Sequence, residues 1–295
     1  MKNLRILIII FFCVTAAGFA VYKVRDLAVK DTGAPVITSD TETIQVSIKA
    51  DDDQMLQGLH AEDDRDGDVT DSLVVVSHTK FFAKGKFRVN YAAFDKKGNV
   101  GTYTRVLEYT DYTSPQFSVI SPFRYKENEG NLQLLSKVKA EDCLEGDISG
   151  LIKLKYDEGS YVNIDEEGKA GVTFQVTNSC GDTVQLPVQL EFLDEETWSL
   201  PYPILSEYLV YTPVNTEVDY AEYLTGVNVG GSELLFEDAK TGKDYGYFRK
   251  NVSIDPQVDY SNPGIYPVVY TLNSSDEEKG TEELGSVTMY VEVRK

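Results

Sequence analysis

Three stretches of the chain share a pattern in which a glycine is followed by apolar residues at every second position. In the first copy, Phe87, Val89 and Tyr91 alternate with polar residues, which predicts a β-strand with one buried face. The leading glycine fits a turn that needs a positive φ or a close approach of two backbones. The copies occupy residues 85–95, 168–178 and 264–274. Three copies of one strand predict three copies of one β-domain.

Shorter alternating runs and turn residues surround each copy, and the chain has no helical periodicity after residue 30. They include expected strands at 69–77, 132–138 and 148–154 and an expected turn at 51–53. An X-Pro start opens the first two units at Pro35 and Pro115. We therefore predict an all-β fold of three tandem β-sandwiches after one N-terminal transmembrane helix. The expected bounds are 1–30 for the N-terminal segment and 31–110, 111–194 and 195–295 for the domains, the last of them divergent. Short linkers between the domains predict a rod with limited bending.

The N-terminal segment has no charged residue from Ile6 to Tyr22, and basic residues flank it on both sides. A stretch of about 17 residues is at the short end of what a helix needs to cross a bilayer. Small residues at positions 15–20 are also compatible with signal-peptide cleavage. Because apolar residues continue beyond them, we expect an uncleaved anchor with a cytoplasmic N-terminus and extracellular domains. The alternative is a cleaved signal and a secreted protein.

The net charge of −20 disfavours nucleic acid as a partner, because an acidic field repels phosphates. Catalysis is not expected either. A nucleophile needs a positioned base, and the chain has only two histidines, His60 and His78. No glycine-rich phosphate loop opens a helix.

An acidic motif precedes the repeated strand in the first two units. It reads Ala61-x-Asp63-x-x-Asp66-Gly67-Asp68-Val69-Thr70 in the first and Ala140-x-Asp142-x-x-Glu145-Gly146-Asp147-Ile148-Ser149 in the second. With the X-Pro start and the repeated strand, this motif resembles bacterial immunoglobulin-like repeats of Gram-positive surface proteins, which also occur in pesticidal crystal proteins. The resemblance covers residues 32–295 and weakens in the third unit, which lacks the acidic motif. It implies that the three sandwiches are immunoglobulin-like, and it implies an extracellular spacer, structural or adhesion role with a cell-envelope component or another protein as partner.

Two cysteines lie in turns of the second unit. Cys143 is inside the acidic motif and Cys180 follows the repeated strand, where the first unit has Asp64 and Lys97. If the two turns are adjacent, the thiols can reach each other, and we predict a Cys143–Cys180 disulfide in an oxidising exterior. It would close a loop of about 38 residues and contribute about 3–4 kcal/mol. The alternative is two buried free thiols.

The corresponding turns of the first unit carry Asp63, Asp66, Asp68 and Asp95, a candidate calcium site because calcium prefers several carboxylate oxygens. The spacing does not match an EF-hand loop, so we favour the alternative that these carboxylates cap tight turns. No other cofactor is expected.

Aromatic residues gather at the start of the third unit. Trp198 and Tyr202 are candidates for stacking on a glycan, which would make the chain a secreted or surface module that binds glycan or cell wall. The alternative is that these rings fill the core, as strand-forming residues do. Solvent-facing rings would favour binding, and buried rings would favour a spacer.

Overall fold

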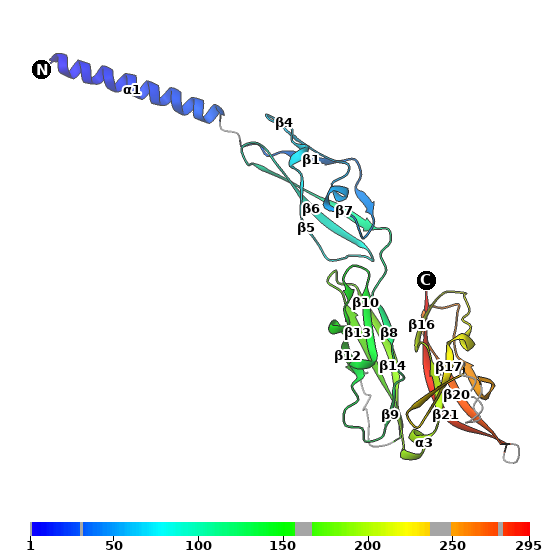
Figure 1. Ribbon diagram of the computed structural model, residues 1–295. Coiled ribbons are helices and arrows are strands. Elements are labelled where there is room, and N and C mark those ends of the chain that lie inside the picture. The colour runs from blue at the N-terminus through cyan, green and yellow to red at the C-terminus, as the bar shows by residue number, and fades with distance from the viewer. Residues whose placement is uncertain (1, 30–31, 157–166, 237–248, 277–279) are drawn as a thin grey trace. The chain divides into compact units, whose positions relative to one another are not determined.

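A computed structural model describes residues 2–29, 32–156, 167–236, 249–276 and 280–295 (Figure 1). The chain divides into two compact units, Met1–Tyr112 and Thr113–Lys295. Helix α1 and one β-sandwich belong to the first unit, and two further sandwiches belong to the second. The predicted all-β fold with an N-terminal helix is therefore confirmed.

The first unit contains α1 (Lys2–Val29), β1 (Val36–Ser39), β2 (Thr43–Val46), α2 (Asp52–Met55), β3 (Leu59–Asp63), β4 (Gly67–Asp68), η1 (Thr70–Ser72), β5 (Val74–His78), β6 (Lys86–Phe94) and β7 (Val100–Tyr109). The second sandwich contains β8 (Gln116–Val119), β9 (Arg124–Lys126), η2 (Leu134–Lys137), β10 (Val138–Asp142), β11 (Gly146–Asp147), η3 (Ser149–Leu151), β12 (Lys153–Tyr156), β13 (Gly168–Thr177) and β14 (Thr183–Leu193). After α3 (Glu195–Ser199), the third contains β15 (Tyr202–Leu205), β16 (Leu209–Pro213), η4 (Tyr220–Tyr223), β17 (Leu224–Val229), β18 (Ser232–Leu235), η5 (Arg249–Asn251), β19 (Val252–Pro256), β20 (Gly264–Asp276) and β21 (Gly280–Arg294).

The three sandwiches repeat one topology. Over the described residues, each pairs a three-stranded sheet with a four-stranded sheet. The three-stranded sheets have the orders β1-β3-β4, β8-β10-β11 and β15-β17-β18, and the four-stranded sheets have the orders β2-β7-β6-β5, β9-β14-β13-β12 and β16-β21-β20-β19. In each four-stranded sheet the outer strand β2, β9 or β16 pairs in parallel with its neighbour β7, β14 or β21, while the other pairs are antiparallel. The third sandwich thus keeps the full strand order of the first two although its sequence diverges.

The repeated strand lies at the centre of each four-stranded sheet, as β6, β13 and β20. Its alternating apolar residues face the core: Tyr91, Phe174 and Tyr270 are all fully buried. The leading glycine needs a positive φ in the first copy, where Gly85 has φ 68° and a Cβ would lie 3.3 Å from the Cβ of Tyr112. The period-two prediction is therefore correct for all three copies.

Short helices form at places where the sequence pattern predicted strands or turns. Asp51 caps α2 by accepting the N–H of Gln54 at 2.9 Å, and the Gln54 side chain accepts the N–H of Asp51 in return. This capping box makes one helical turn from residues expected to form a simple turn. One-turn 3₁₀ helices η1, η2 and η3 replace parts of the expected strands 69–77, 132–138 and 148–154.

The second and third sandwiches pack side by side (Figure 1), which corrects the expected rod-like arrangement for these two domains. Their buried residues form one continuous hydrophobic cluster. The Tyr290 hydroxyl of β21 accepts the N–H of Gln189 in β14 at 2.7 Å, and the Tyr211 hydroxyl of β16 donates to the carbonyl of Phe117 in β8 at 2.7 Å. Side-chain contacts between the second and third sandwiches therefore hold them side by side, although the short linker between them predicted an extended rod.

Candidate functional site

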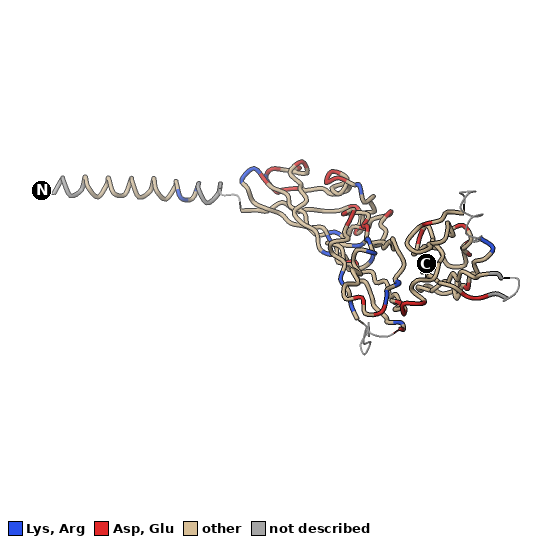
Figure 2. The backbone as a smooth tube through the Cα atoms, turned by 60° about the horizontal axis from the view of Figure 1, so that its bottom comes forward, with Lys and Arg blue, Asp and Glu red and all other residues tan. Residues whose placement is uncertain are grey.

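Three carboxylates meet at one end of the first sandwich. Asp63 ends β3, Asp66 lies in the β3–β4 turn, and Asp95 follows β6. One carboxylate oxygen from each lies within 4.8 Å of the others. Asp63 and Asp95 are buried. Asp and Glu residues occur along both units (Figure 2), and these three are a group whose carboxylate oxygens lie close together.

Each of the three carboxylates already accepts hydrogen bonds from the protein. Asp63 Oδ1 accepts the N–H groups of Arg65 and Asp66 at 2.9 and 3.0 Å. Asp66 Oδ2 accepts the N–H of Lys96 at 2.8 Å, which joins the two turns. These bonds support the interpretation that the carboxylates cap turns.

Asp95 is held in the same way. Its Oδ1 accepts the N–H groups of Lys97 and Asn99 at 2.9 and 2.7 Å, and its Oδ2 accepts the Asn99 amide at 2.6 Å. Burial raises the pKa of the Asp95 carboxyl, but these hydrogen bonds outweigh burial and leave the pKa below its ordinary value.

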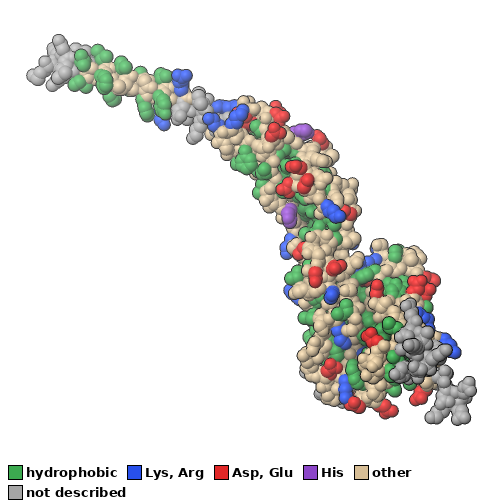
Figure 3. Space-filling model, in the orientation of Figure 1, with side chains coloured by type: hydrophobic (Ala, Val, Ile, Leu, Met, Phe, Trp, Pro, Cys, Tyr) green, Lys and Arg blue, Asp and Glu red, His purple; other side chains and the backbone are tan. Residues whose placement is uncertain are grey.

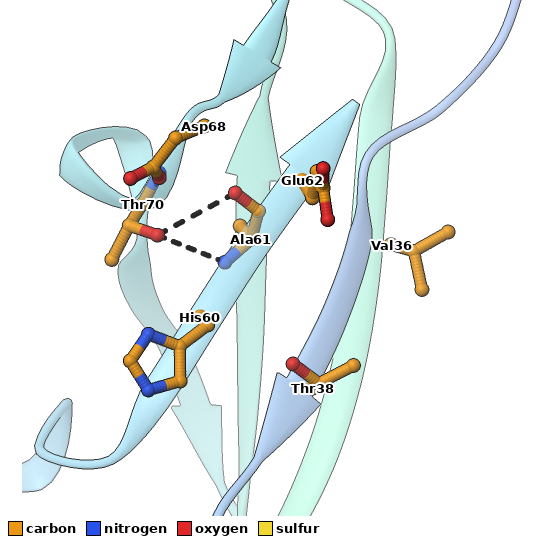
Figure 4. A pocket seen from close by; sticks show the side chains of 7 residues that line it. All are labelled: Val36, Thr38, His60, Ala61, Glu62, Asp68 and Thr70. Atoms are coloured by element: carbon orange, nitrogen blue, oxygen red, sulfur yellow. Dashed lines mark hydrogen bonds between the residues drawn. The ribbon is translucent and has the colours of Figure 1, made fainter. Parts of the chain in front are cut away.

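Asp68, the fourth member of the candidate calcium set, lies outside this group of three carboxylates. It lies on β4 and accepts the N–H of Thr70 at 2.9 Å, and this hydrogen bonding lowers the pKa of the Asp68 carboxyl. A shallow pocket of about 370 Å³ lies beside it on the outer face of β1 and β3. Figure 4 shows His60, Glu62 and Asp68 around this pocket, with Thr70 bonded back to Ala61. His60 is exposed, and its Nε2 lies 3.6 Å from Asp40.

The corresponding end of the second sandwich carries partly different residues. Asp142 takes the place of Asp63 and accepts the N–H groups of Leu144 and Glu145 at 2.9 and 3.1 Å. Asn178 takes the place of Asp95, and its amide donates to Asp142 Oδ2 at 3.0 Å. An amide in one sandwich thus stands where the other has a carboxylate.

The two cysteines of the second sandwich lie at this end, and both thiols are free in the structure, so the predicted disulfide is not formed there. The Cys143 thiol donates to the carbonyl of Thr113 at 3.1 Å. Cys180 lies 4.0 Å from the Ser179 hydroxyl, measured from sulfur to oxygen. Burial raises the pKa of the Cys180 thiol, as do the charges of Glu145 and Asp142.

The candidate stacking residues Trp198 and Tyr202 lie around a buried arginine at the start of β9. The Arg124 guanidinium carbon lies 4.1 Å from the centre of the Tyr202 ring and 5.9 Å from that of Trp198. Arg124 is 5% exposed, and Glu191 lies 4.0 Å from its Nε. Tyr202 is partly buried, whereas Trp198 remains 38% exposed. These two rings therefore help to join the second and third sandwiches through a cation–π contact.

Sequence reasoning missed Arg124 and also Arg105, which is buried in the first sandwich. Both stand in strands among apolar residues, and arginine is rarely fully buried unless paired. The only sequence signal is that Arg124 lies between Phe123 and Tyr125 at the start of a strand. That pattern does not indicate which partners the guanidinium meets.

A groove of about 420 Å³ lies between the second and third sandwiches. Its walls come from β13, β14, β20 and β21 and include Pro187, Pro267 and Ile265, with Lys169 at its edge. The Lys169 ammonium lies 3.5 Å from Glu191, so its charge is already paired.

Helix α1 includes a 19-residue segment, Leu7–Arg25, that is long and apolar enough to cross a membrane or to serve as a signal sequence. Hydrophobic side chains cover it on the face that Figure 3 shows, and all of its residues are exposed.

No family model matches the chain, and no curated protein matches it. Several solved structures resemble it. The M60 catalytic domain with CBM51 domains of ZmpB from Clostridium perfringens is 12% identical, with a TM-score of 0.20 over 90% of this chain and 31% of that one. The protocadherin GammaB4 extracellular domain is 13% identical, with a TM-score of 0.19 over 90% of this chain and 50% of that one. A lipoprotein from Bacteroides thetaiotaomicron is 9% identical, with a TM-score of 0.24 over 60% of this chain and 98% of that one. Similarity at these scores carries no argument about function.

Proposed function

We propose that this chain is a membrane-anchored extracellular protein whose immunoglobulin-like repeats have a structural, spacer or adhesion role at the bacterial cell surface. The observation that carries the proposal is helix α1. Its residues from Leu7 to Tyr22 carry no charge and are exposed on every side of the helix. A helix that is apolar all round is unfavourable in water and favourable in hydrocarbon, so this segment needs a lipid environment.

The junction between the second and third sandwiches supports a spacer role. Tyr290, Tyr211 and Arg124 tie the two domains at separate points, and their cores form one cluster. Two domains joined in this way transmit force or position as one body. The motifs shared with Gram-positive surface repeats also support this role, and the partner would be a cell-envelope component or another protein.

Binding of glycan or cell wall is the second candidate function, and Trp198 favours it because its ring remains 38% exposed. Tyr202 is less suited to stacking on a sugar, because it faces the Arg124 guanidinium. Cosedimentation of the chain with purified cell wall would test this candidate, with Trp198→Ala compared against Tyr202→Phe. Equal binding by both variants and the native chain would rule out Trp198 as a stacking residue.

The anchored topology is tested by the mass and cellular fraction of the native protein. We expect the full-length chain in the membrane fraction, with its sandwiches removed from intact cells by external protease. Ile10→Arg places a charge within the uncharged stretch of α1 and should reduce membrane retention, whereas the control Ile10→Leu should not. A shorter chain in the medium beginning near residues 18–21 would contradict the anchor. Full protection of the sandwiches in intact cells would contradict the extracellular placement.

A further inference from the structure

We propose that Cys143 and Cys180 are a redox pair that forms an intramolecular disulfide across one end of the second sandwich. The two turns that carry them are bonded directly to each other. The Asn178 amide donates to Asp142 Oδ2 at 3.0 Å, and the N–H of Ser179 donates to Glu145 Oε1 at 2.7 Å.

Each cysteine is adjacent in sequence to a residue that makes one of these bonds. Cys143 follows Asp142, and Cys180 follows Ser179. The Cys143 sulfur is also among the groups whose charge acts on Cys180, which is consistent with two thiols in one cluster. Both side chains are only partly buried, so an oxidant can reach them.

The first sandwich shows that this end does not require cysteine. Its equivalent turns are joined by the bond from the N–H of Lys96 to Asp66 Oδ2, and the positions of the two cysteines hold Asp64 and Lys97. The turn bonds are therefore common to both sandwiches, whereas the thiol pair belongs to the second alone. A role in folding the turn does not explain two cysteines at these positions.

The reaction is thiol–disulfide exchange with an external disulfide, either an oxidised low-molecular-weight thiol or a thiol–disulfide oxidoreductase. One cysteine thiolate attacks the oxidant and forms a mixed disulfide, releasing the first thiol of the oxidant. The second cysteine then displaces the other thiol and forms the Cys143–Cys180 bond. The pair loses two electrons and two protons, and the oxidant is reduced to two thiols. Oxidation also removes the S–H donor that bonds the Thr113 carbonyl.

The test uses the purified full chain in detergent, treated with oxidised glutathione or with a reductant. Digestion without reduction should yield one linked peptide pair containing residues 143 and 180, lighter by two hydrogens than the two reduced peptides. Fluorescence of Trp198, the only tryptophan of the chain, reports unfolding of the same unit. Oxidation should raise its melting temperature by roughly 10 °C, because the disulfide restricts the unfolded chain.

Three variants separate the outcomes. Cys13→Ser should keep the full oxidation-dependent shift, whereas Cys143→Ser and Cys180→Ser should each lose it while retaining the melting temperature of the reduced native chain. The proposed Cys143–Cys180 disulfide is refuted if the thiols of both residues still react with an alkylating agent after the folded chain has been oxidised. It is also refuted if oxidation yields only glutathione adducts or dimers linked between chains. None of these readouts depends on where the cell places the protein, so the proposed surface location can fail independently.

Discussion

Arg105 provides a sharp test of the first sandwich, because backbone carbonyls and a hydroxyl hold its buried guanidinium. It is 2% exposed and lies on β7. Its Nη2 donates to the carbonyl of Met55 at 2.7 Å, and its Nη1 donates to the carbonyl of Gln57 at 2.9 Å and to the Ser39 hydroxyl at 3.2 Å. The guanidinium also lies 5.5 Å from the centre of the Tyr91 ring. Arg105 therefore bonds the end of α2 and the residues that follow it to the sheet.

Arg105→Met keeps most of the side-chain volume and removes these donors. A hydrogen bond to a charged group contributes roughly 1.5–3 kcal/mol, so the two bonds to carbonyls set an upper loss of about 6 kcal/mol. The Met55 carbonyl keeps one partner, because the Tyr91 hydroxyl donates to it at 3.0 Å. Removing a buried charge also relieves its desolvation cost. We therefore expect the variant to lose about 3 kcal/mol, which lowers the melting temperature of a sandwich this size by roughly 15 °C.

The assay is thermal and urea denaturation of the full chain, followed by far-ultraviolet circular dichroism and by tryptophan fluorescence. Trp198 lies in the second unit, so Arg105→Met should move a circular-dichroism transition and leave the fluorescence transition in place. Arg88→Met is the matched control. Arg88 is exposed on the adjacent strand β6, and its loss should change stability by less than about 0.5 kcal/mol. An Arg105→Met chain within about 1 kcal/mol of the native one would refute the argument that these bonds hold the segment.

Three further predictions concern the junction, a buried lysine and the acidic cluster. Tyr290→Phe removes the hydroxyl bonded to Gln189 and should lower the free energy of unfolding of the second unit by about 1 kcal/mol in urea denaturation. Tyr266→Phe removes an exposed hydroxyl and should lower it by less. Burial lowers the pKa of Lys137 from 10.5 to about 8, so the folded state binds fewer protons than the unfolded state between these values. The second unit should therefore gain stability as pH rises from about 8 to about 9.5, and Lys137→Met should remove that gain; an unchanged slope in the variant would contradict the assignment. A chelator should leave the melting temperature of the first unit unchanged, because the carboxylates already accept protein donors. A fall that Asp95→Asn abolishes would instead assign a calcium ion to the cluster.

The candidate sites could be predicted only in part. Asp63 and Asp95 are far apart in sequence, yet the shared motif correctly placed them at one end of the sandwich. The motif did not show that Asp68 points elsewhere, because Asp68 lies on a separate two-residue strand and bonds to Thr70. Trp198 and Tyr202 were recognised as aromatic residues with two alternative roles. Which partners they meet depends on Arg124, whose burial no local pattern indicates.

The sequence alone determined the strands and the repeat, because strand periodicity is a local property. Each residue faces the core or the solvent according to its place in the alternation, so Tyr91, Phe174 and Tyr270 could be assigned to the core before any partner was known. Only the tertiary structure decided the side-by-side packing of the second and third sandwiches and the burial of Arg105 and Arg124. These features depend on contacts between residues far apart in the chain. For Arg105 such contacts supply carbonyl acceptors, and for Arg124 they supply two ring faces and the carboxylate of Glu191.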